Sequence, residues 1–249
     1  MSRPASPARA VAALASHELR LTARRGENIL VTLVIPAGIL VFFATVGAMP
    51  GIEGRPVDFL VPGTLALAVI ASGLVSLGIV TAFERSYGVL KRLGGAPSPR
   101  WGLVAAKIAA VLALEVLQVA VLLAVAAVVL EWRPSPAASI PLFAIALGGG
   151  TIVFAGLGLL LAGTLRAEAT LALANGLFFV CLVVGGIVLP VDRLPGPVEA
   201  LARALPASAL SDLFRAALGG PAEVLGPLVV LAAWGLGAAG LAVRTFRWE

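Results

Sequence analysis

The residues best placed to do chemistry in this sequence are a carboxylic acid and an amide, Glu115 and Gln118, within an otherwise apolar stretch from Ile108 to Leu130. A helix would place them on one face, because they are three residues apart. In a lipid bilayer, an ionised side chain costs roughly 2.5 to 3.5 kcal/mol on insertion scales. Glu115 is therefore either a contact for a cargo or coupling ion, or a protonated or hydrogen-bonded group that faces the interior of a bundle.

Asn175 is the third polar candidate inside an apolar stretch. A proton-driven carrier normally needs a relay of several ionisable groups within its membrane segments. Here Glu115 is accompanied only by two amides, those of Gln118 and Asn175. The sequence therefore favours a polar group that faces the bundle interior, and it weakens the case for a secondary transporter.

The two lysines of the chain exclude a phosphate-binding loop. Such a loop ends in Gly-Lys followed by Ser or Thr, whereas Lys91 and Lys107 are followed by Arg92 and Ile108. We therefore expect that this chain does not bind ATP in that way.

Ligands for metals and cofactors are equally scarce. The single histidine, His17, precedes the first apolar stretch, and the single cysteine, Cys181, lies inside a later one. Zinc and haem sites fail for shortage of ligands, and an intramembrane serine protease would need a histidine beside its serine. We expect no catalytic residue, no metal and no cofactor. For a membrane-embedded enzyme, the nearest approximation to a cluster is Asp192, Asp212 and Arg215.

Six long stretches that are poor in charge must position these side chains. Each has about the 20 apolar residues that a helix needs to cross the hydrocarbon core. The composition agrees, since 60% of residues are hydrophobic and only 12% are charged. Unbroken apolar runs do not fit the alternation of barrel strands. We predict an all-α integral membrane protein, one transmembrane domain over residues 1–249, with spans at about 29–49, 60–83, 103–130, 141–165, 169–190 and 223–243.

The basic residues fall on alternate sides of these spans. Of the 18 Lys and Arg, 13 lie in the N-terminal region, the loop after the second span, the turn at Arg166 and the C-terminal tail. By the positive-inside rule, both termini are cytoplasmic in a multi-pass protein of the cell membrane. The net charge of +5 matches anionic lipid headgroups, and the absence of an aromatic-interleaved basic patch argues against nucleic acid.

Two segments on the cytoplasmic side have features of their own. Residues 8–27 hold an amphipathic pattern that predicts a helix lying along the membrane surface. In residues 84–101, Gly94 and Gly95 suit a helix C-terminus and Pro97 prevents continuation, so we expect a short protruding helix. An ordinary positive-inside loop is the alternative interpretation.

The external segment of residues 191–221, between the last two spans, is longer than a hairpin turn. Its prolines divide it into two short apolar-faced pieces, 198–205 and 208–218, and neither is long enough to cross a bilayer. We predict two re-entrant helices, half buried from the outer side.

These parts, in this order, resemble the membrane subunit of the type-2 ATP-binding-cassette exporters, especially the compact antibiotic and daunorubicin-resistance permeases. The resemblance covers nearly the whole chain. It depends on the surface helix, on Val61-Pro62-Gly63, on Glu84-Arg85 with Gly88, Leu90, Leu93 and Pro97, and on Leu189-Pro190, Leu194-Pro195 and Pro206-Ala207-Ser208. Ser86 stands where the family often has a second acidic residue, and Val89 stands where Thr is frequent.

This resemblance implies a separate ATPase subunit and a second permease chain, identical or different, around a central pathway. The helix near Tyr87 would then be the coupling helix that sits in a groove of the ATPase. The residues that the resemblance suggests for this contact are Glu84, Arg85, Tyr87, Gly88, Leu90, Lys91 and Arg92. The expected function is non-catalytic export of a hydrophobic or amphipathic, drug-like small molecule.

Two other functions stay open at this point. The same kind of complex could export a lipid or a polysaccharide. The composition of the chain does not distinguish these cargoes from a drug-like molecule. A stand-alone six-span channel or ion-coupled carrier would transport without ATP and would depend on Glu115.

Overall fold

The computed structural model describes residues 7–24, 26–46, 55–89 and 100–245 of the chain. Within these ranges, every regular element is a helix. The elements are α1 (Pro7–Arg24), α2 (Gly26–Val46), α3 (Pro56–Ile70), the π-helix η1 (Ala71–Leu77), α4 (Gly78–Ser86), α6 (Arg100–Val129), α7 (Ile140–Thr164), α8 (Ala167–Val184), the 3-10 turn η2 (Val191–Arg193), α9 (Gly196–Ala204), α10 (Pro206–Ala217) and α11 (Leu225–Thr245).

Five helices in the described part of the chain are long and apolar enough to cross a membrane. They are Pro56–Ser86 (α3, η1 and α4 together), Trp101–Val129, Ile140–Thr164, Ala167–Val184 and Leu225–Thr245. In α2, Thr32–Val46 is a shorter apolar helix. The all-helical membrane fold is confirmed, whereas the crossing by α2 stays a prediction.

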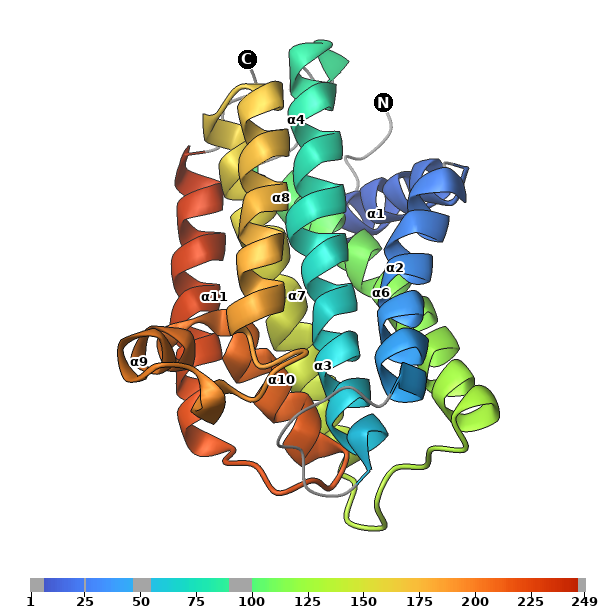
Figure 1. Ribbon diagram of the computed structural model, residues 1–249. Helices are drawn as coiled ribbons and strands as arrows, with labels where there is room; N and C mark the ends of the chain where they lie inside the picture. Colours follow the sequence, from blue (N-terminus) through green and yellow to red (C-terminus); the bar gives the residue numbers. More distant parts are fainter. Residues whose placement is uncertain (1–6, 25, 47–54, 90–99, 246–249) are drawn as a thin grey trace.

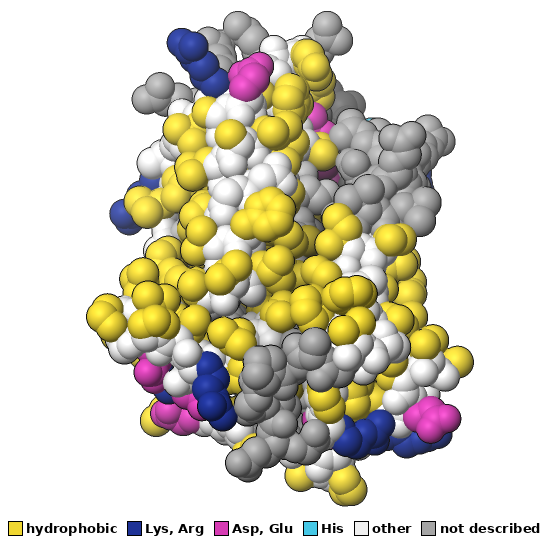
Figure 2. Space-filling model, viewed as in Figure 1, with side chains coloured by type: hydrophobic (Ala, Val, Ile, Leu, Met, Phe, Trp, Pro, Cys, Tyr) yellow, Lys and Arg dark blue, Asp and Glu magenta, His cyan; other side chains and the backbone are white. Residues whose placement is uncertain are grey.

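The long helices stand side by side as a bundle, and α1 lies across them at one end (Figure 1). The end of α4 and the turn between α7 and α8 lie at the same end as α1, whereas α9 and α10 lie toward the opposite end. Hydrophobic side chains cover the middle of the face in Figure 2, and charged side chains gather toward the two ends. This distribution is the one that a membrane-spanning bundle requires, because charges are costly in hydrocarbon.

The continuous helix of α3, η1 and α4 forms the centre of the bundle. Its residues from Leu60 to Leu74 are all buried, and it contacts α2, α6, α7, α8 and α10. Glycines permit its close approach to α7: a Cβ on Gly73 would lie 2.7 Å from the backbone nitrogen of Ala155, and a Cβ on Gly158 would overlap the Gly73 carbonyl oxygen. Small residues bring these backbones together, as in other membrane bundles.

Two short helices lie between α8 and α11, where the external pieces 198–205 and 208–218 were predicted. The helix α10 is well buried, with Leu210, Leu213 and Phe214 inaccessible to solvent, whereas Leu201 on α9 is exposed. Prolines begin both helices, in the first turn of each, where the missing N–H costs nothing. The helices exist as predicted; how deeply they enter a membrane stays a prediction.

Candidate functional site

Gln118 ties three helices together in the middle of the bundle. Its Oε1 accepts a hydrogen bond of 2.7 Å from the Ser72 hydroxyl in η1, and its Nε2 donates one of 2.7 Å to the Thr32 hydroxyl oxygen in α2. The side chain is buried, so each of these bonds replaces one that water would have made. The amide therefore acts as a polar connector between α2, η1 and α6.

Glu115 lies on the same face of α6, one turn earlier, and is fully buried. It contacts the Thr151 hydroxyl of α7, and that hydroxyl also lies 2.7 Å from the Leu147 carbonyl oxygen. A hydroxyl carries one hydrogen, and a helical Thr commonly donates it to the carbonyl four residues earlier. The Thr151 hydroxyl, as the donor, is therefore shared between the Glu115 carboxyl oxygen and the Leu147 carbonyl oxygen.

The surroundings of Glu115 favour its neutral form. Its second oxygen, Oε1, is buried and has no hydrogen-bond partner in the part of the chain that the structure describes. An ionised carboxylate with an unpaired oxygen in such a place would be expensive, and the structure records no ion pair for Glu115 among the described residues. The arrangement is the bundle-facing polar group that the sequence favours.

Asn175 is separated from this network. It is partly exposed on α8, and its side-chain nitrogen donates 2.8 Å to the Leu171 carbonyl of its own helix. The structure thus brings Glu115 and Gln118 together on α6 and leaves Asn175 on another face of the bundle.

A second polar cluster lies at the end of the bundle where α1 crosses it. Lys107 of α6 is 1% exposed, and its ammonium group lies 3.1 Å from Glu18 of α1 and 2.8 Å from Glu84 of α4. One cation therefore holds two carboxylates from helices that are far apart in sequence. We call Lys107, Glu18 and Glu84 the inner ion cluster.

Arg85, next to Glu84, makes a further contact near the start of α8. Its guanidinium donates a hydrogen bond to the Leu165 carbonyl at the end of α7. That carbonyl lies beside the turn that contains Arg166, so Arg85 attaches the end of α4 to this turn. Glu84 and Arg85 were predicted to contact an ATPase. In the structure, both side chains bind residues of their own chain.

Beyond Ser86 the chain turns and presents its side chains outward. Tyr87 is 75% exposed, Val89 is exposed, and Gly88 has a φ of +73°, a conformation that favours glycine. The Gly88 turn ends α4 and redirects the backbone. Leu90, Lys91 and Arg92 lie outside the described residues.

Sequence reasoning missed Lys107, Glu18 and Thr151 as functional candidates. Lys107 entered only the exclusion of a phosphate-binding loop and the count of cytoplasmic charges, and Glu18, an acidic residue within the apolar sector of the surface helix, was not singled out. That misplaced carboxylate was the available signal, since a charge on the packed face of a helix needs a partner. Thr151 gave none, because hydroxyls are common in membrane helices.

The described residues contain no group of three or more His, Cys, Asp or Glu side chains that could hold a metal ion. The residues of the enzyme alternative lie near one another at the other end of the bundle, where Arg215 pairs with Asp212 at 2.5 Å.

The family model of the ABC-2 type transporter matches residues 9–218. No curated protein matches the sequence. The family match extends from α1 through α10 and so contains the inner ion cluster, the Glu115 and Gln118 contacts and the turn at Gly88.

Proposed function

The chain belongs to the ABC-2 type transporter family, and we propose that it is the permease subunit of an ATP-binding-cassette exporter for a hydrophobic or amphipathic small molecule. The observation that carries this proposal is the family match, which covers all but the last of the long apolar helices. In the proposed complex, a separate ATPase chain hydrolyses ATP and a second permease chain completes the pathway.

The proposed topology has six crossings, with α2 as the first span and both termini in the cytoplasm. The excess of Lys and Arg on the side that holds α1 and the Gly88 turn supports this orientation. In this frame α1 lies along the inner membrane surface, and α9 and α10 enter the membrane from the outer side.

The proposed ATPase contact is the segment after Ser86. Tyr87 and Val89 are exposed there. They lie just after Glu84, which pairs with Lys107 of α6, and Arg85, which donates to the Leu165 carbonyl at the end of α7. A displacement of Tyr87 by a partner would therefore act on three helices at once. In this role Glu84 and Arg85 transmit the motion within the chain, and Tyr87 with the following residues makes the contact.

The test of function is ATP-driven flux. The chain is reconstituted with its ATPase in inverted vesicles, and uptake of a fluorescent amphipathic compound is followed with ATP or with a nonhydrolysable analogue. We expect uptake with ATP and no uptake with the nonhydrolysable analogue. Flux through the purified chain in liposomes without any ATPase would contradict the proposal and would favour the stand-alone carrier.

The test of the contact is co-purification with the ATPase. Tyr87→Ala is expected to weaken binding roughly tenfold, the effect of losing one exposed aromatic anchor of an interface. Leu236→Ala is the matched control, because Leu236 is 81% exposed on α11, far along the chain from this turn. If removal of residues 86–93 left the ATPase bound as tightly as before, the assignment of this segment would be wrong.

A further inference from the structure

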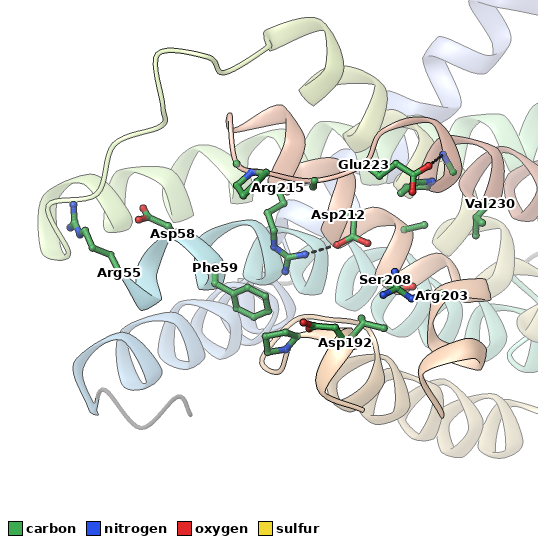
Figure 3. A pocket seen from close by; sticks show the side chains of 18 residues that line it. Arg55, Asp58, Phe59, Asp192, Arg203, Ser208, Asp212, Arg215, Glu223 and Val230 are labelled. Carbon is green, nitrogen blue, oxygen red and sulfur yellow. Dashed lines mark hydrogen bonds and ion pairs between the residues drawn. The ribbon is translucent and has the colours of Figure 1, made fainter. Parts of the chain in front are cut away.

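A cavity of about 710 Å³ opens at the end of the molecule opposite α1. Its walls come from the first turn of α3, the segment after α8, the helices α9 and α10, and the start of α11 (Figure 3). The volume lies in the range of sites that hold small organic molecules. Val191, Pro227 and Val230 contribute apolar surface to the lining, and seven of the lining residues carry charged side chains.

Arg215, the most buried arginine of the cavity lining, already contacts groups of its own chain. Arg215 donates 2.5 Å to Asp212 and 2.7 Å to the Gly186 carbonyl, and its guanidinium lies 4.2 Å from the centre of the Phe59 ring (Figure 3). This combination of ion pair, carbonyl and aromatic face fixes the guanidinium in place. Arg215 thus forms part of the wall through its two terminal nitrogens, while its buried Nε has no hydrogen-bond partner among the described residues.

The other two arginines are engaged as well. Arg203 donates two hydrogen bonds, of 2.9 and 2.8 Å, to Glu199 one turn earlier on α9. Glu199 itself lies outside the cavity lining. Arg55 donates a longer bond of 3.4 Å to the Leu130 carbonyl.

The carboxylates of the cavity keep free acceptor capacity. Four line it, namely Asp58, Asp192, Asp212 and Glu223, against three arginines. Asp58 accepts one bond of 2.8 Å from the Trp132 indole, and Glu223 accepts a weak one of 3.3 Å from the Gly226 backbone. Asp192 is exposed, and the structure records no bond for it within the described residues. Since Glu199 neutralises Arg203, the cavity has an excess of negative charge.

The charges act on one another across the cavity. The bond to Glu199 raises the pKa of Arg203, and the more distant Asp212 and Asp192 raise it further. Burial lowers the pKa of Arg215, against the opposing effect of Asp212 and Asp192. Burial raises the pKa of Asp212, against the effect of both arginines. Asp192 therefore exerts its field on two guanidinium groups without bonding to either.

We propose that this cavity binds an organic cation, with the cationic group near Asp192 and Glu223 and the apolar part against Val191, Pro227 and Val230. The proposal builds on the proposed export function, in which the site lies on the outer side and receives the cargo before release. The same chemistry, an organic ammonium group, also occurs in lipid headgroups, and the experiment below separates the two sources.

The test uses two ions of the same shape and opposite charge, tetraphenylphosphonium and tetraphenylborate. The purified full chain in phosphatidylglycerol nanodiscs is titrated with each ion, and binding to empty nanodiscs is subtracted. We expect saturable binding of the cation. Absence of saturable cation binding would overturn the proposal.

The variant that tests the site carries Asp192→Asn together with Glu223→Gln. Both side chains are exposed, so the fold is expected to persist. Cation binding should weaken roughly threefold to tenfold, as for the loss of two exposed charge pairs, while binding of the borate should not weaken. The matched control is Glu131→Gln, an exposed carboxylate outside the cavity lining. If the double variant bound the cation as tightly as this control, the proposal would be wrong.

Two further arms assign the occupant and separate this proposal from the function. Phosphatidylethanolamine in place of phosphatidylglycerol would compete with the probe if the natural occupant were a lipid amine, and would not compete if it were a free cargo. ATP-driven flux in a chain that shows no saturable cation binding would contradict the proposed cation site and leave the proposed export function standing. Saturable cation binding together with flux that needs no ATPase would support the proposed cation site and contradict the proposed export complex.

Discussion

A single ammonium group, on Lys107, connects the surface helix α1 with the end of the central helix through two carboxylates. Breaking a buried ion pair by removing one partner leaves the other charge without compensation in a poorly solvated place. The inner ion cluster therefore stabilises the packing of α1 on the bundle only while the amine is present.

We expect Lys107→Met to lower the free energy of unfolding by about 3 kcal/mol or more, because it removes the buried amine that pairs with both carboxylates. The measurement is thermal or denaturant unfolding of the purified chain in detergent. The control is Arg203→Gln, which breaks an exposed ion pair and should cost less than about 1 kcal/mol. Equal losses for the two variants would contradict the importance of the buried cluster.

Glu115→Gln is expected to change the free energy of unfolding by less than about 1 kcal/mol, because the Gln side-chain oxygen can accept the Thr151 hydrogen as the Glu115 oxygen does. Thr151→Val should cost about 1 to 3 kcal/mol, since it leaves the buried acid without its partner. ATP-driven flux of Glu115→Gln should persist. Abolished flux in this variant would support ion coupling through Glu115 instead.

The sequence predicted these side chains unevenly, for physical reasons. The spacing of Glu115 and Gln118 was enough to place them on one face, because helix geometry is local. Their partners Thr32, Ser72 and Thr151 come from three other segments, and only helix packing brings them together. The same is true of Lys107, whose partner Glu18 is 89 residues away.

At the scale of elements, the central helix depends on glycine. The π-helical stretch η1 contains Gly73, and a Cβ on Gly158 of α7 would overlap its carbonyl oxygen. Wide turns of this kind occur frequently at functional sites, and here the stretch also carries Ser72, the partner of Gln118. The same few residues therefore set both the closest helix approach and the polar contact.

Gly158→Ala should destabilise the chain by about 1 to 3 kcal/mol, because the added methyl group forces α7 away from η1. Gly237→Ala is the control on α11: nothing lies within 4 Å of its added Cβ, so the change should stabilise the helix by up to about 1 kcal/mol. Unfolding midpoints in detergent compare the two. A neutral Gly158→Ala would mean that the backbones can separate without cost.

The elements themselves were mostly predictable, because long apolar runs and prolines determine where helices begin and end. The external pieces 198–205 and 208–218 correspond to α9 and α10, which begin a little earlier, at Gly196 and Pro206. Glycines are a poorer guide to packing: Gly158 lies at a close contact, whereas Gly237 faces open space. Spacing alone does not tell which face of a helix meets a neighbour.

At the scale of the whole molecule, the proposed six crossings would place Ser16 of α1 and Thr245 of α11 on one side and Ala137 on the other. All three side chains are exposed. The test replaces the single cysteine (Cys181→Ala), introduces one cysteine at each position in turn, and labels intact cells with an impermeant maleimide. We expect labelling of A137C alone. Labelling of S16C together with A137C, but not of T245C, would show that α2 does not cross the membrane.

The bond between Lys107 and Glu18 also bears on the order of synthesis. A ribosome releases α1 long before it has made Lys107, which lies at the start of the third proposed span. During that interval α1 lacks its packing against α6, the helix that it contacts most. Its final seat on the protein forms once the third span has been delivered to the bilayer, so a nascent chain stopped before Lys107 should keep α1 accessible to protease.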